Sequence, residues 1–104
     1  MKRPAAIPTV QIEDDRVKVT EWRFPPGGET GWHRHAMHYV VVPQTTGALL
    51  LETQHGAVTS QLTAGLAYVR PAGVEHNVIN PGLHEFVFVE IELKGAQAAA
   101  APGS

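Results

Sequence analysis

The chain has 104 residues, which is enough for one domain with a buried core and too few for a second. Its formal net charge of −2 offers no basic surface for nucleic acid or an anionic membrane, and no apolar run is long enough to span a bilayer. Because the chain contains no cysteine, disulfide bonds and thiolate chemistry are excluded. We therefore expect a cytoplasmic protein that binds neither nucleic acid nor a membrane.

In chain order, the sequence predicts short strands separated by turns that are rich in glycine and proline. Residues 16–24 alternate between two faces, and nowhere does a helical period of 3.6 residues persist for three turns. The Ala-rich tail at 95–104 has no face to bury and is expected to be disordered, which leaves 1–94 as a single domain. Many short strands of this kind are typical of an all-β sandwich or barrel. The expected strands are 16–24, 33–42, 48–54, 57–62, 66–70, 76–79 and 85–93.

The second of these strands carries the first candidate for chemistry. Three of the six histidines lie within six residues, and His33 and His35 are separated by one residue. Side chains at i and i+2 leave the same face of a strand, so both imidazoles should point to one spot, and Met37, Tyr39 and Val41 should continue that face. Two imidazoles on one face form half of a metal site.

A second pattern lies further along the chain. It reads G-x5-P-x-G-x2-H-x3-N and matches the second signature of the cupin superfamily at every fixed position. Five fixed residues coincide by chance about once in a million starting positions or less often. The matching residues are Gly65, Pro71, Gly73, His76 and Asn80.

The first cupin signature, G-x5-H-x-H-x3-E-x6-G, covers the histidine strand and matches at Gly27, His33 and His35. Tyr39 stands where the family usually has glutamate, and the closing glycine, Gly47, comes one residue later than the commonest spacing. The chain thus resembles a small single-domain cupin and, more narrowly, the small cupins known as β-alanine degradation proteins. This resemblance implies a double-sheet jelly-roll barrel whose interior can hold a ligand and a metal.

The resemblance also implies that His33, His35 and His76 hold one divalent transition metal per chain. Three neutral imidazoles suit iron, manganese, nickel, cobalt, copper or zinc, and they leave coordination positions open. His38 is a weaker candidate for a fourth ligand. By strict alternation His38 faces away from the site and Tyr39 faces it, but a β-bulge would exchange the two. The remaining two histidines, His55 and His84, fall in predicted turns and are expected to be exposed to solvent.

A tyrosine in place of glutamate changes the expected charge of the site. An unperturbed phenol has a pKa near 10, so Tyr39 should stay neutral and act as a hydrogen-bonding neighbour instead of a ligand. The metal would keep its full charge and favour a small chelating anion, such as a carboxylate, a keto acid or an enolisable dicarbonyl. Tyr39 is therefore a candidate catalytic residue; the alternative is that it packs as an ordinary strand aromatic.

Other side chains carry less information. Trp32, Met37 and Tyr68 are expected in the wall of a substrate pocket. Glu90 would be a buried candidate base if the phenylalanine face of the last strand pointed into the barrel. If that face met solvent or a second subunit, Glu90 would be ordinary surface, and this second interpretation is the favoured one.

Two classes of function stay open. The favoured one is a metal-dependent enzyme: a dioxygenase if the metal is iron, or a lyase, isomerase or hydrolase acting by Lewis acidity. The alternative is a non-catalytic cupin that binds a metal or a small molecule, although the chain offers no further domain through which a sensor could report. The edge strands of so short a jelly roll need covering, which predicts a homodimer with an apolar interface.

Overall fold

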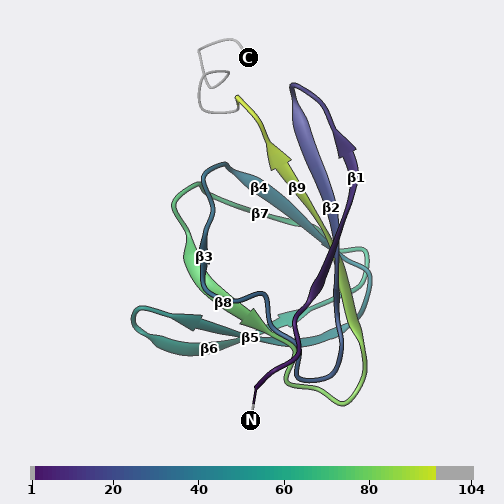
Figure 1. Cartoon of the computed structure of the whole chain (residues 1–104), viewed down its shortest axis with the longest axis vertical. Coiled ribbons are helices and arrows are strands. Elements are labelled where there is room, and N and C mark those ends of the chain that lie inside the picture. Colours follow the sequence, from purple (N-terminus) through teal and green to yellow (C-terminus); the bar gives the residue numbers. More distant parts are fainter. Residues whose placement is uncertain (1, 96–104) are drawn as a thin grey trace.

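The computed structural model describes residues 2–95, and within them it contains β-strands and no helix. Two antiparallel sheets face each other and curve into a jelly-roll barrel, as Figure 1 shows. The all-β, double-sheet fold predicted from the sequence is confirmed. The strands are β1 (Ile7–Glu13), β2 (Val17–Phe24), β3 (His33–Arg34), β4 (Tyr39–Pro43), β5 (Gly47–Thr53), β6 (Gly56–Leu62), β7 (Tyr68–Arg70), β8 (Glu75–Ile79) and β9 (Phe86–Leu93).

The hydrophobic core fills the space between the two sheets. One sheet has the strand order β1-β2-β9-β4-β7, and the other has the order β3-β8-β5-β6. Phe24 of the first sheet and Leu49 of the second are fully buried, and the rings of Phe24 and Phe88 lie 5.4 Å apart. On β9, Phe86, Phe88 and Glu90 are all buried, so the phenylalanine face points into the barrel. The favoured interpretation of Glu90 as ordinary surface is therefore wrong.

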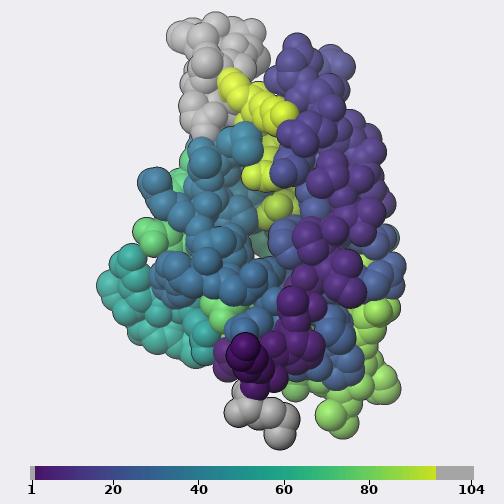
Figure 2. Space-filling model, viewed as in Figure 1, coloured from purple at the N-terminus to yellow at the C-terminus, as the bar shows by residue number. Residues whose placement is uncertain are grey.

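The N-terminal strand β1 lies outside the strands expected from the sequence. It forms the edge of the larger sheet, where it pairs with β2, and each of its residues is exposed. Figure 2 shows this purple segment on the surface along one side of the molecule. Although Val10 and Ile12 alternate with polar residues, neither face of the strand is buried. The strand also contains Pro8 and a register shift between Val10 and Ile12. An edge strand tolerates both features because one side of its backbone needs no partner.

The expected strand 33–42 is in fact two strands in different sheets. β3 pairs with β8 in the smaller sheet, whereas β4 pairs with β9 and β7 in the larger one. Residues 35–38, which we call the crossing segment, connect them, and the main-chain nitrogen of His35 still bonds the carbonyl oxygen of Val74 at 2.9 Å. The prediction of one continuous strand is wrong, because a chain that turns a barrel corner must leave one ladder before it joins the other.

Asn80, the last fixed position of the second signature, ties together loops at one end of the barrel. The residue is 2 % exposed, and its side-chain nitrogen donates to the carbonyl oxygens of His84 at 2.8 Å and of Phe24 at 3.3 Å. Its side-chain oxygen accepts a hydrogen bond from the main-chain nitrogen of Gly82 at 3.0 Å. A buried amide needs partners for both its donor and its acceptor, and these main-chain groups supply them.

The last described strand is tied to the first by an ion pair. Lys94 Nζ lies 2.7 Å from Glu13 Oε2, so the end of β9 is held against β1. Except for Gly95, the tail that was expected to be disordered lies outside the described residues. No helix within residues 2–95 has the length and apolar character needed to cross a membrane.

Candidate metal centre

Three histidines converge inside the barrel. His33 on β3 and His76 on β8 are partners in the strand register, and His35 follows β3 directly. The Nε2 atom of His35 lies 2.9 Å from that of His33 and 3.1 Å from that of His76. His35 and His76 are buried, and His33 is half-buried. The structure thus brings together the three residues that the resemblance implies as ligands.

The protonation of these rings suits a metal. His33 Nδ1 lies 2.8 Å from the carbonyl oxygen of Gly31, which can only accept, so Nδ1 carries the proton and Nε2 keeps its lone pair. Burial, helped by the neighbouring imidazole of His33, lowers the pKa of His35 to about 3 and that of His76 to about 4. His35 and His76 are therefore neutral at pH 7. A cluster of imidazole Nε2 atoms is a donor set that divalent transition metals accept, so these residues fit such an ion.

The turn before β8 positions both His76 and the crossing segment. Gly73 has φ of 98°, in the left-handed region that favours glycine, and its nitrogen donates to the carbonyl oxygen of His35 at 2.7 Å. The main-chain nitrogen of Ala72 donates to His38 Nδ1 at 2.9 Å. His38 is thus engaged with this turn and does not join the three-histidine cluster, so the structure does not support it as a fourth ligand. The bulge considered between His35 and Tyr39 does not form, because residues 35–38 belong to no strand of either sheet.

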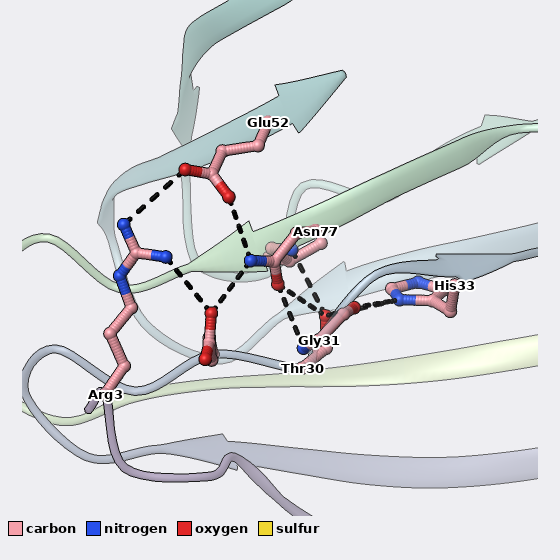
Figure 3. A network of polar contacts seen from close by, with 8 residues as sticks. Arg3, Thr30, Gly31, His33, Glu52 and Asn77 are labelled. Atoms are coloured by element: carbon pink, nitrogen blue, oxygen red, sulfur yellow. Dashed lines mark hydrogen bonds and ion pairs between the residues drawn. The ribbon is translucent and has the colours of Figure 1, made fainter. Parts of the chain in front are cut away.

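A polar network on the β8 side holds the main chain that orients His33 (Figure 3). The side-chain oxygen of Asn77 accepts a hydrogen bond from the nitrogen of Gly31 at 2.9 Å. Thr30 Oγ1 donates to the carbonyl oxygen of Gly31 at 2.9 Å and accepts from the nitrogen of Val78 at 3.1 Å. The carbonyl group that faces His33 Nδ1 is therefore fixed by the contact of Asn77 with the nitrogen of the same residue and by the hydroxyl group of Thr30.

The same network continues to the N-terminal segment, as Figure 3 also shows. The side-chain nitrogen of Asn77 donates to Glu29 Oε1 at 2.8 Å and to Glu52 Oε1 at 3.0 Å. Arg3 forms ion pairs with both carboxylates, at 3.1 Å and 3.5 Å. The hydrogen bonds from Asn77 and Arg3 lower the pKa of Glu29 below its usual value, so this carboxylate stays ionised. The carboxylates of Glu29 and Glu52 are thereby both held by the amide of Asn77 and the guanidinium of Arg3.

Side chains of the larger sheet contact His35 from the opposite wall. The ring of Tyr39 stacks on the ring of His35, with centroids 3.8 Å apart and planes 19° from parallel. Glu90 Oε2 lies 3.6 Å from His35 Nδ1, and Glu90 Oε1 accepts a hydrogen bond from Trp22 Nε1 at 3.4 Å. Burial raises the pKa of Glu90 to about 7. Burial and the nearby Glu90 carboxylate also raise the pKa of Tyr39, so its phenol is neutral.

The histidines and this opposite wall border one cavity of about 410 Å³. Its wall is partly apolar, with Val41 and Phe88 from the larger sheet and Leu49 from the smaller one. Arg70 also lines it, with its guanidinium carbon 5.6 Å from the ring centroid of Tyr68. No carboxylate of residues 2–95 forms an ion pair with Arg70. Besides the three imidazoles, the cavity therefore presents a guanidinium group that lies over Tyr68 and has no carboxylate partner within residues 2–95.

The expected pocket residues divide into two groups. Tyr68 lines the cavity, whereas Trp32 and Met37 do not. Trp32 is 52 % exposed and lies in the bend before β3. Met37 lies in the crossing segment, where the alternation that would carry the face of His35 forward is interrupted.

The sequence patterns missed Asn77, although a signal for it exists. It is a polar residue between a histidine and two apolar residues of a short strand, and it is 6 % exposed. A buried amide must find partners for both its donor and its acceptor, so such a residue marks a network. Arg3 offers no comparable signal, because it precedes the first strand and is exposed.

Comparison with known proteins supports the fold and identifies the family. Residues 20–92 match the family model described as "Cupin domain". Over 92 residues the chain is 63 % identical to the β-alanine degradation protein BauB of Pseudomonas aeruginosa, covering 88 % of this chain and 97 % of that protein.

Two crystal structures show the same architecture. A cupin domain from Bordetella pertussis Tohama I has a TM-score of 0.90 and 79 % identity, with coverage of 90 % of this chain and 98 % of that one. A conserved protein with a double-stranded β-helix domain from Klebsiella pneumoniae has a TM-score of 0.72 and 25 % identity, covering 88 % and 78 % of the two chains. The chain belongs to the cupin family.

Proposed function

We propose that the protein is a metal-dependent enzyme that acts on a small carboxylate or dicarbonyl at the three-histidine cluster. The observation that carries this proposal is the convergence of three imidazole Nε2 atoms on one wall of a closed barrel. A divalent transition metal held by His33, His35 and His76 would supply Lewis acidity or, if it were iron, oxygen chemistry. A Lewis-acid metal would make the protein a lyase or an isomerase, and iron would make it a dioxygenase.

Two further residues of the cavity, Arg70 and Tyr39, support an anionic substrate. Arg70 places a positive charge in the wall without a carboxylate partner among the described residues, so it can bind a negative group. The neutral phenol of Tyr39 lines the same cavity and can donate a hydrogen bond to a bound oxygen atom. The remaining apolar wall excludes water around a ligand of a few heavy atoms.

The name of the Pseudomonas aeruginosa relative agrees with this substrate class. That protein is named for the degradation of β-alanine, which is itself a small carboxylate. We extend a role in the breakdown of small carboxylates to this chain as part of the proposal. A cytoplasmic location stays a prediction.

The decisive experiment is metal analysis of protein purified without an affinity tag. We expect one divalent transition metal per chain, and His33→Ala, His35→Ala or His76→Ala should each sharply lower the metal content. The matched controls are His55→Ala and His84→Ala, because both side chains are exposed and outside the cluster. A triple variant of the cluster that retained one metal per chain would falsify the assignment. Turnover of small carboxylates by the metal-loaded parent then distinguishes an enzyme from a protein that only binds.

We also propose a homodimer in which the outer face of the larger sheet is covered by a second copy. The outward-facing residues of β9 and β4 are aliphatic, as is Val19 on β2, and the register aligns Val19 with Ile91 and Ile91 with Val40. On the same face, Val42 of β4 pairs with Val89 of β9. Further along β2 the outer face becomes charged, at Glu21 and Arg23. An aliphatic sheet face of this kind is typical of a subunit interface.

Light scattering across micromolar concentrations tests this assembly. The parent should have the mass of a dimer, and Ile91→Lys at the centre of the outer face should give a monomer. The exposed Val58 of β6 in the other sheet supplies the matched control, Val58→Lys. A monomeric parent would refute the proposal.

A further inference from the structure

Glu90 is a buried carboxylate inside a cavity whose proposed chemistry depends on three histidines. It is 8 % exposed and lies on the inner face of β9. Its Oε1 atom accepts a hydrogen bond from Trp22 Nε1 at 3.4 Å, and its Oε2 atom lies 3.6 Å from His35 Nδ1. Burial of a carboxylate costs free energy unless neighbouring groups compensate it. Its place beside His35 therefore needs a physical reason.

The two nitrogens of His35 face different surroundings. Nε2 lies within 3.1 Å of the other two imidazoles, and Nδ1 faces the carboxyl group of Glu90. A carboxyl group offers an acceptor oxygen to Nδ1 whether or not it is protonated, so the proton of the neutral ring belongs on Nδ1. The lone pair of His35 then lies on Nε2. The carbonyl oxygen of Gly31 has the same effect on His33, because it accepts the proton of Nδ1.

The orientation of the His35 ring is set from two directions. Tyr39 stacks on one face at 3.8 Å and restricts tilting of the ring. Stacking alone leaves the ring free to flip, which would exchange Nδ1 with Cδ2 and Nε2 with Cε1. The acceptor at Glu90 distinguishes the two orientations, since only one of them places Nδ1 near Oε2. At 3.6 Å this approach is slightly longer than a hydrogen bond, and Trp22 holds the carboxyl group in place.

We propose that Glu90 is a positioning residue for His35, which keeps the ring proton on Nδ1 and turns Nε2 toward the metal position. The inference rests on the proposed function, because it presupposes a metal at the three histidines. Carboxylates behind ligating histidines fix the tautomer, orient the ring and raise its basicity, and loss of such a partner typically lowers metal affinity about 10- to 100-fold. Glu90 also places a carboxyl group beside a ligand set that is otherwise neutral.

The test compares zinc affinity in four proteins by competition with a chromogenic chelator. Glu90→Gln replaces one acceptor oxygen by a donor of the same size, and we expect it to weaken Zn²⁺ binding about 10- to 100-fold. Glu90→Asp retains the carboxyl group and should recover part of that loss. Glu92→Gln is the matched control, since Glu92 lies on the same strand and lines the same cavity, but has no recorded contact with the three histidines within residues 2–95. We expect its affinity to stay close to that of the parent.

A spectroscopic measurement separates positioning from general packing. With Co²⁺ bound, the visible absorption spectrum reports the geometry of the ligands, so Glu90→Gln should change the spectrum and Glu92→Gln should not. Trp22→Phe, which removes the donor that holds Oε1, should shift zinc affinity in the same direction by a smaller factor, and it serves if Glu90→Gln does not fold. Thermal unfolding of each metal-free variant establishes that it is folded.

The outcomes are distinguishable. Equal losses in Glu90→Gln and Glu92→Gln would reduce the effect to overall charge and overturn the inference. Unchanged zinc affinity in Glu90→Gln would do the same, while one zinc per chain in the parent would leave the proposed site intact. If the parent binds no zinc, cobalt or other divalent transition metal, the proposed function fails, and the inference fails with it.

Discussion

His33 and His35 are two residues apart in the chain, yet different regions of the molecule hold them. His33 is oriented by a main-chain carbonyl group, which the network around Asn77 fixes from the side of the smaller sheet. His35 is oriented by side chains of the larger sheet, through the stacked Tyr39 and the carboxyl group of Glu90. A main-chain contact survives most substitutions of the residue that supplies it, whereas a side-chain contact disappears with one. The wall formed by β4 and β9 is therefore where a single substitution can most readily alter the chemistry of the site.

The largest loss of stability should follow from removing the side chain of Asn77, which supports the loop before His33. Asn77→Ala would leave the partly buried nitrogen of Gly31 without its partner and remove a donor between Glu29 and Glu52. Leaving a buried polar group unsatisfied costs about 1–3 kcal/mol, so the free energy of unfolding should fall by about that amount. Chemical denaturation measures it.

The control for this prediction is Gln61→Ala on β6, where an exposed amide is removed from the surface. This change should alter the free energy of unfolding by less than about 0.5 kcal/mol. If Asn77→Ala were as mild as the control, the network would not be what fixes the loop before His33.

Two different substitutions of Tyr39 test how the larger sheet influences the site around His35. Tyr39→Phe retains an aromatic ring over His35 and should change ligand binding little, although it could slow turnover if the hydroxyl donates a proton. Tyr39→Glu adds a like charge near a bound anion and can occupy a coordination position, so small carboxylates and dicarbonyls should bind about tenfold more weakly, or worse. Calorimetric titration of the metal-loaded proteins is the measurement. Equal or tighter anion binding by Tyr39→Glu would contradict the expected preference for an anion.

The smallest effect on stability should come from Arg3, which lies at the exposed end of the network around Asn77. Its ion pairs with Glu29 and Glu52 are partly exposed, and exposed pairs contribute about 0–1 kcal/mol. Arg3→Ala should therefore lower the free energy of unfolding by less than about 1 kcal/mol, and the difference should shrink at high salt. Denaturation at two salt concentrations checks both statements. A loss as large as that of Asn77→Ala would show that the N-terminal segment, and not Asn77, supports the loop.

The spacing of the two motifs was sufficient to predict that His33, His35 and His76 come together. Strand register explains this, because His33 and His76 are direct partners on β3 and β8. The burial of Tyr39 was also expected, but from an unbroken strand that does not exist. Tyr39 faces the cavity because β4 enters the other sheet with that residue pointing inward.

Other features were beyond a single sequence. The outward face of β9 is entirely aliphatic, whereas the inward face carries two phenylalanines and two glutamates, so alternation alone favours the wrong direction for Glu90. In β1, Val10 and Ile12 alternate with polar residues, yet the strand has no buried face. Both cases depend on packing between sheets, and periodicity along one strand does not contain that information.

The crossing segment makes the metal centre a reporter of complete folding. His35 lies where the chain leaves the smaller sheet, and Tyr39, which stacks on it, belongs to the larger one. His35 and His76 are also 41 residues apart in sequence, so their approach requires the closure of a long loop. An ion held by all three histidines would bind the assembled barrel and not the unfolded chain, and would raise the unfolding midpoint with its concentration. Hydrogen exchange in β8 and β4 should then slow together, because opening either sheet would release the same ion.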